Sequence, residues 1–138
     1  MRRKVYYMSQ RGPAEAVAVA IARVAGCQPE PLLPAYMPEN VDLMFLGCEG
    51  ERADKVTLSF IDSLNPNRVR RAALFQCANI RGEAANQMRA ALAARGISVS
   101  ERVFTAPNKN LFGRGGPAQA DLDEARAFAK AVIEQAWN

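Results

Sequence analysis

Histidine is absent from this sequence of 138 residues. A Ser-His-Asp triad, a Cys-His dyad and a histidine-based zinc site all need an imidazole, so this chain can form none of them. Long hydrophobic runs are absent too, because Glu15 and Arg23 interrupt the most apolar stretch and no segment of about 18 uncharged apolar residues exists. The apolar run at residues 5–8 is too short for a signal-peptide core. We therefore expect a cytoplasmic protein that does not associate with membranes.

Cysteine is scarce, and its spacing is not that of a metal site or a disulfide scaffold. Cys27, Cys48 and Cys77 are an odd number without a C-x-x-C pair, which is typical of thiols in a reducing compartment. Basic charge is not concentrated either. The net charge of +4 includes short clusters at residues 2–4 and 68–71 but no long basic stripe interleaved with aromatic residues. We therefore expect no nucleic-acid partner.

The residues that are present fit one folded domain spanning residues 1–138. Hydrophobic residues make up 49% of the chain and charged residues 23%, close to the average of globular proteins. Disordered, collagen-like and coiled-coil chains have different compositions. No internal repeat is present, and the length is that of a common single domain.

Hydrophobic periodicity predicts strands that alternate with helices. The expected strands are residues 5–8, a brief edge strand near 32–33 among four prolines, 41–46, 72–77 and 97–104. The expected helices are residues 14–25, a segment capped by Asp54 and running to Leu64, 83–95, and a last helix whose inner face runs from Leu122 to Ala136. A loop is expected at residues 105–117. This alternation predicts right-handed crossovers and a parallel sheet covered by helices on both faces.

Three loops should meet at the carboxyl edge of this sheet: residues 9–14, 47–54 and 77–83. Ligands of open α/β sheets bind at that edge, where the strand order reverses. The loop at residues 9–14 leads directly into a helix. Backbone N–H groups at a helix start, with the positive end of the helix dipole behind them, suit a phosphate.

Several motifs, spread over the whole chain, resemble those of the flavodoxin family. Ser-Gln-Arg-Gly-Pro-Ala at residues 9–14 stands where that family has Ser-x-Thr-Gly-Asn-Thr, and a Val-Ala-x-x-Ile-Ala helix follows at 17–22. Further motifs resemble short bacterial flavodoxin-like proteins: Asp-Leu-x-Phe-Leu-Gly at 42–47, Gly-Gly-Pro at 115–117 and Asp-Leu-x-x-Ala-Arg-x-Phe-Ala at 121–129. The resemblance implies a flavodoxin-like α/β three-layer sandwich, with a five-stranded parallel sheet in the order 2-1-3-4-5.

The resemblance also implies FMN binding and electron transfer to a redox partner protein. The phosphate would sit at the start of the first helix, and the flavin ring would lie between the second and third loops. The implied cofactor-binding residues are Ser9, Gln10, Arg11, Gly12, Pro13, Ala14, Cys48, Glu49, Gly50, Cys77, Ala78, Asn79, Ile80, Arg81 and Gly82. No catalytic or metal-binding residue is assigned.

This flavin site departs from the family pattern. Arg11 and Ala14 replace two threonines and Pro13 lacks an N–H, so three hydrogen bonds of about 1 kcal/mol each are lost. Arg11 could instead grip a phosphate with two parallel hydrogen bonds. The second and third loops contain no Trp or Tyr to cover the ring, and Ile80 is their one large apolar residue. A weakened FMN site is therefore expected.

Two alternatives to FMN-dependent electron transfer remain open. The first is a flavin-free domain that binds another phosphorylated ligand or a protein partner. The sequence pI of about 9.3 favours it, because flavodoxins are typically acidic. The second is a flavin-dependent reductase, although this chain has little spare length for the required substrate pocket. Whether the protein is an enzyme, and how many copies associate, is left open.

Two pairs of side chains near the strand ends are further candidates. Cys48 and Cys77 end strands that the expected order makes neighbours, so they are either small buried residues or a thiol pair close enough for a disulfide. Glu49 and Glu51 could act as paired carboxylates. Their position in a glycine-containing loop beside Arg52 is more typical of a solvated turn.

Overall fold

A single five-stranded parallel sheet organises the computed structural model, which describes residues 1–32, 37–108 and 117–137. The strand order is β2-β1-β3-β4-β5, which confirms the predicted order and fold class. The strands are β1 (Arg3–Tyr7), β2 (Pro29–Pro31), β3 (Val41–Glu49), β4 (Val69–Cys77) and β5 (Ser98–Ala106). The chain reverses its direction of travel across the sheet between β2 and β3, and this places the carboxyl ends of β1 and β3 side by side.

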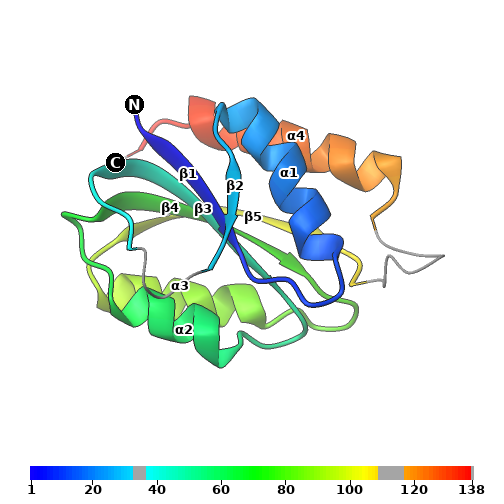
Figure 1. Ribbon diagram of the computed structural model, residues 1–138, viewed down its shortest axis with the longest axis horizontal. Helices are drawn as coiled ribbons and strands as arrows, with labels where there is room; N and C mark the ends of the chain where they lie inside the picture. Colours follow the sequence, from blue (N-terminus) through cyan, green and yellow to red (C-terminus); the bar gives the residue numbers. More distant parts are fainter. Residues whose placement is uncertain (33–36, 109–116, 138) are drawn as a thin grey trace.

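Helices cover both faces of the sheet (Figure 1). On one face lie α1 (Pro13–Ala25) and α4 (Gln119–Glu134), and on the other α2 (Lys55–Asp62) and α3 (Ala84–Ala94). Each face has its own apolar core, with Phe45 and Phe75 under α1 and α4, and Leu46 and Leu74 under α2 and α3. Among the residues that the structure describes, no helix is both long enough and apolar enough to cross a membrane.

The strands differ in extent from the sequence prediction. β3 and β4 are longer than predicted, because backbone pairing continues past the apolar run to Glu49 in β3 and begins before it, at Val69, in β4. β2 precedes the predicted edge strand, and prolines are tolerated there because an edge strand pairs on one side only. The predicted loop at 105–117 is wrong at its start, where two residues extend β5, and residues 109–116 lie outside the described part.

Residues that cap or end helices have their expected geometry in the structure, although α2 ends at Asp62, two residues before the predicted Leu64. The Asp54 carboxylate accepts a hydrogen bond from the backbone N–H of Thr57 at 2.9 Å and so caps α2. Gly26 ends α1 in the left-handed conformation, with φ of 76°. At Gly47, a Cβ atom would lie 2.2 Å from the Phe75 ring, so only glycine fits between β3 and this aromatic core residue.

Candidate functional site

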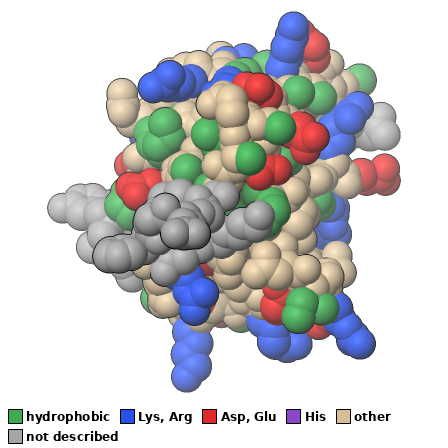
Figure 2. Space-filling model, turned by 90° about the vertical axis from the view of Figure 1, so that its right-hand side faces the viewer, with side chains coloured by type: hydrophobic (Ala, Val, Ile, Leu, Met, Phe, Trp, Pro, Cys, Tyr) green, Lys and Arg blue, Asp and Glu red, His purple; other side chains and the backbone are tan. Residues whose placement is uncertain are grey.

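The three predicted loops lie together at the carboxyl edge of the sheet: the first loop (residues 9–14), the second loop (47–54) and the third loop (77–83). Backbone hydrogen bonds join them at their bases, from the N–H of Met8 to the carbonyl of Gly47 at 3.0 Å and from the N–H of Gly50 to the carbonyl of Cys77 at 2.9 Å. Figure 2 shows the molecule from this side, with acidic, basic and hydrophobic side chains interspersed over its coloured part. The loops therefore form one continuous candidate site.

The first loop surrounds the carboxylate of Glu49, the last residue of β3. Four backbone N–H groups and one hydroxyl donate hydrogen bonds to this carboxylate. The backbone donors are Gln10 and Arg11, both at 2.9 Å from Oε1, and Gly12 and Ala14, at 3.2 and 3.0 Å from Oε2; the hydroxyl is that of Ser9. Both oxygens of one side chain thus occupy the donors at the start of α1.

The charge of Glu49 is stabilised by this arrangement. Burial alone would raise the pKa of the carboxyl, but the hydrogen bonds from the Ser9 hydroxyl and the loop N–H groups outweigh burial and hold the pKa below its usual range. The N-terminus of α1 adds its positive dipole. A small hollow of about 110 Å³ remains beside the carboxylate, lined by Met8, Gln10, Glu49 and Asp54.

The third loop surrounds a second carboxylate, that of Glu51. Four consecutive backbone N–H groups donate to it: Asn79 at 2.7 Å, Ile80 at 3.2 Å, Arg81 at 2.8 Å and Gly82 at 2.9 Å. The hydrogen bond from Gly82, followed by that from Asn79, lowers the pKa of Glu51 below its usual range. The prediction of a solvated turn is therefore wrong for the half-buried Glu49, whereas the Glu51 carboxylate lies at the surface as predicted but is hydrogen-bonded to the third loop.

The glycine between the two glutamates sends their side chains to different loops. Gly50 has a φ of 101°, in the region that favours glycine, and it turns the chain directly after β3. Glu49 reaches back to the first loop, whereas Glu51 reaches across to the third loop. The second loop thereby holds both of its neighbours through side-chain carboxylates.

The third loop presents an exposed aliphatic side chain. Ile80 is 87% exposed. The loop beneath it is held by Glu51 and by Asn79, whose side-chain amide and the backbone of Asn108 exchange two hydrogen bonds, at 3.1 and 2.7 Å. A shallow hollow of about 220 Å³ lies beside Ile80, lined also by Glu51, Arg52, Arg81 and Glu83.

The other candidate residues of the three loops differ in their exposure and contacts. Arg11 and Arg81 are exposed, and Arg52 pairs with Glu83 at 3.4 Å. Pro13 opens α1, so its missing N–H costs no helical hydrogen bond. Ala78 is buried at the base of the third loop.

The proposed thiol pair is wrong, although Cys48 and Cys77 lie on neighbouring strands. In the register of β3 and β4, Glu49, not Cys48, is opposite Cys77. Successive side chains of a strand point to opposite faces, so Cys48 packs under α2 and α3 and Cys77 under α1 and α4. Both thiols are fully buried, and burial raises the pKa of each to about 12. The alternative interpretation, that Cys48 and Cys77 are small buried residues, is therefore correct.

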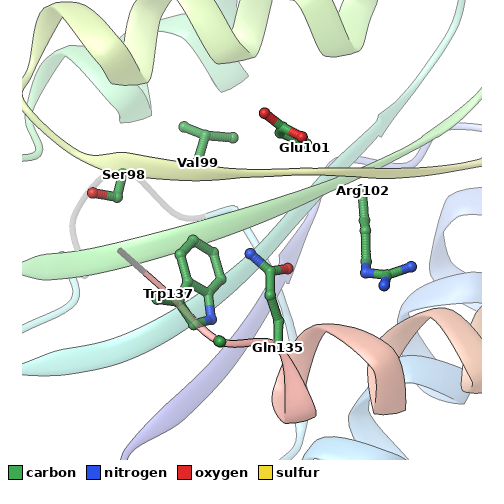
Figure 3. A pocket seen from close by; sticks show the side chains of 7 residues that line it. Ser98, Val99, Glu101, Arg102, Gln135 and Trp137 are labelled. Atoms are coloured by element: carbon green, nitrogen blue, oxygen red, sulfur yellow. The ribbon is translucent and has the colours of Figure 1, made fainter.

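Another cavity lies away from the three loops. It has a volume of about 470 Å³ and is formed between the start of β5 and the end of α4. Ser98 and Arg102 of β5 face Gln135 and Trp137 across it (Figure 3). The Trp137 ring also packs against the Arg71 guanidinium, 5.5 Å from the ring centroid. None of the candidate cofactor-binding residues lines this cavity.

Solved structures share this fold along almost the whole chain. A flavodoxin from the domain Archaea matches with a TM-score of 0.76 and 17% identity over 97% of both chains. The chain has a flavodoxin-like fold. Flavodoxin 2 from Bacillus cereus matches with a TM-score of 0.73 and 14% identity, over 97% of this chain and 99% of that one. The flavodoxin of Streptococcus pneumoniae TIGR4 matches with a TM-score of 0.72 and 11% identity, over 96% and 98%. No family model and no curated protein matches the sequence.

The site of this flavodoxin-like chain does not fit FMN in the arrangement that the structure shows. The first-loop N–H groups that would receive its phosphate already donate to Glu49. The hollows beside Glu49 and Ile80, about 110 and 220 Å³, are smaller than the roughly 300–1,000 Å³ of typical cofactor pockets. No aromatic side chain of the second or third loop is available to cover a flavin ring.

The sequence interpretation missed the role of the two glutamates. The sequence does contain a signal for this role. One acidic residue stands on either side of a glycine directly after a buried strand, and this segment lies between two loops rich in free backbone N–H groups. The pattern gave no direction for either side chain, because direction depends on where β3 ends and on the conformation of Gly50.

Proposed function

We propose that this flavodoxin-like protein has no resident FMN and binds a protein partner through its third loop. The first part is supported by the Glu49 carboxylate, which accepts hydrogen bonds from the backbone N–H groups of the first loop that would otherwise bind a phosphate. A phosphorylated ligand meets the same obstacle as FMN. Of the flavin-free alternatives, protein binding therefore remains.

Ile80 supports the second part of the proposal. Exposed aliphatic side chains on preorganised loops lose little conformational freedom on binding, which favours affinity. The exposed Arg81 is next to Ile80, Arg52 is paired with Glu83, and the whole chain carries a net charge of +4. We expect a partner with an apolar pocket bordered by acidic groups. The three free thiols of the structure suit the cytoplasm as the place of this interaction.

Absorption spectroscopy and FMN titration test the first part. We expect colourless purified protein and no saturable quenching of FMN fluorescence at micromolar protein. A yellow protein that keeps one FMN per chain through desalting would overturn the proposal.

Site-specific photo-crosslinking tests the second part. A photoreactive amino acid at position 80, introduced in the native cells, should capture one defined protein. The same group at Lys130, an exposed position on α4, is the matched control. We expect Arg81→Glu to abolish capture at position 80 while leaving the thermal stability unchanged. Equal capture from both positions would show that the third loop is not the docking site.

Electron transfer through a weakly held FMN is the second candidate function. The match to the archaeal flavodoxin over 97% of both chains favours it. It requires Glu49 to leave the first loop when FMN binds. Stoichiometric FMN binding by the wild-type protein, with a reversible reduction of the bound flavin, would support this candidate over the flavin-free one.

A further inference from the structure

We infer that Glu49 is an internal ligand that occupies a latent oxyanion site in the first loop, and that its carboxylate excludes phosphate from this site. The inference concerns the first loop alone. It goes beyond the proposed function and does not depend on what the third loop binds.

The geometry of the first loop is that of an anion site. The N–H groups of Gln10, Arg11, Gly12 and Ala14 converge on one group at 2.9–3.2 Å, and a helix of 13 residues begins directly behind them. Such convergent donors at a helix start bind oxyanions through their partial positive charge. A carboxylate and a phosphate both present oxygen acceptors with negative charge, so either satisfies the same donors.

Glu49 has two advantages over a free phosphate. It is tethered to β3, so its effective concentration at the loop is on the order of millimolar or higher without any loss of translational freedom. Its charge also repels a second anion, and Asp54 lines the same hollow and adds to that repulsion. A phosphate therefore has to displace Glu49 before it can use the donors.

The donors remain in place when the carboxylate is removed, because they belong to the backbone. Gly12 still accepts the first helical hydrogen bond from Ala16 at 3.0 Å, and the Ser9 hydroxyl still accepts one from the N–H of Gly12 at 3.1 Å. These contacts do not involve Glu49. Replacing Glu49 should therefore leave an empty anion site and not a collapsed loop.

Inorganic phosphate is the probe, with Glu49→Ala as the test variant and Glu15→Gln as the matched control. Glu15 carries the same charge in the first turn of α1, but its carboxylate contacts the Tyr7 hydroxyl at 3.0 Å and no loop N–H. Calorimetry at constant ionic strength should show phosphate binding at least about tenfold tighter to Glu49→Ala than to the wild type, a difference of about 1.4 kcal/mol. Glu15→Gln should bind phosphate no better than the wild type.

Amide chemical shifts locate the bound ion. In Glu49→Ala, phosphate should shift the backbone signals of Gln10, Arg11, Gly12 and Ala14 and raise the melting temperature. Acetate, a free carboxylate, should restore stability to this variant and have no effect on the wild type. If Glu49→Ala does not fold, Glu49→Gln keeps the side-chain size and one acceptor oxygen, and it should show the same gain to a smaller degree.

Two results would overturn the inference. Equal phosphate affinity in the wild type and in the folded Glu49 variants would show that the carboxylate excludes nothing. A gain in affinity without shifts in the first-loop amides would place the ion elsewhere. The first result would also remove the argument from Glu49 against FMN binding, but FMN retention and capture at position 80 are measured directly on the wild-type protein, so failure of the proposed function and failure of this inference are distinguishable.

Discussion

The first and third loops are two solutions to the same problem, which is how to satisfy backbone N–H groups that point to the carboxyl edge of a parallel sheet. Each loop encloses a glutamate carboxylate of the second loop, Glu49 in one case and Glu51 in the other. The surroundings differ. Glu49 ends a strand, stands before a helix start and gains a hydroxyl donor, whereas the third-loop hydrogen bonds to Glu51 lie largely at the exposed surface.

Because their surroundings differ, the contacts of Glu49 and Glu51 have different consequences. Water can replace an exposed hydrogen bond at little cost, so Glu51 chiefly shapes the loop that carries Ile80. Glu49 lies where the fold would otherwise receive an anion, so its carboxylate determines which ligands the first loop accepts. Two identical side chains, two residues apart, therefore act on conformation in one case and on ligand access in the other.

Replacing the residue between the two glutamates should have the largest effect. In Gly50→Ala, a side chain at φ of 101° costs about 1–3 kcal/mol, and both carboxylates are displaced from their loops as the backbone relaxes. Gly26→Ala is the control, because Gly26 also has positive φ and has no other atom within 4 Å of its added Cβ. Chemical denaturation should show a larger loss for Gly50→Ala. Equal losses would mean that Gly50 has no role beyond its own backbone strain.

Removing one carboxylate at a time should distinguish the contributions of the two loops to the free energy of unfolding. We expect Glu49→Gln to lower the free energy of unfolding by about 1–2 kcal/mol, a value already reduced for solvent screening of a partly exposed group. Glu51→Gln should lower it less, since its donors are exposed. Urea denaturation of both variants measures the difference, and a greater loss in Glu51→Gln would reverse the order proposed here.

Acid should destabilise the protein through the same carboxylates. The pKa values of Glu49 and Glu51 are lowered from 4.5 in the folded state, so at intermediate pH the unfolded chain binds more protons. Their contribution is complete above the unfolded pKa and is lost as the pH falls through the lower, folded value. Melting temperatures measured from neutral pH to below pH 4 should fall less steeply in Glu49→Gln. An unchanged slope would show that Glu49 does not contribute.

The cysteines should show the smallest effect. Alternation along β3 and β4 places Cys48 and Cys77 on opposite faces of the sheet, and burial raises both pKa values to about 12. Thiol labelling of the native protein should therefore modify the half-buried Cys27 first, and mild oxidation should leave Cys48 and Cys77 reduced. A peptide that links these two residues after oxidation would contradict the strand register.

Sequence patterns determined which segments are strands and helices, because those depend on local and periodic features. The helix predicted over residues 14–25 is α1, which begins one residue earlier at Pro13, and the run at 41–46 belongs to a buried strand. The resemblance to flavodoxins supplied the order 2-1-3-4-5, which the structure confirms. The cofactor-binding residues of the first loop remain a prediction, although the loop itself lies where it was expected.

Only the tertiary structure decided what the loops contain. The sequence placed Glu49 and Glu51 in one turn, but their contacts are made with donors 28 to 40 residues away along the chain, and no local pattern encodes contacts at such sequence separations. It likewise placed Cys48 and Cys77 at neighbouring strand ends, but a single-residue offset in register put them on opposite faces. Composition and periodicity fix which segments are strands and helices, because backbone geometry repeats. The direction of a side chain at a strand end depends instead on the last paired residue and on one glycine dihedral angle, which only the packed fold sets.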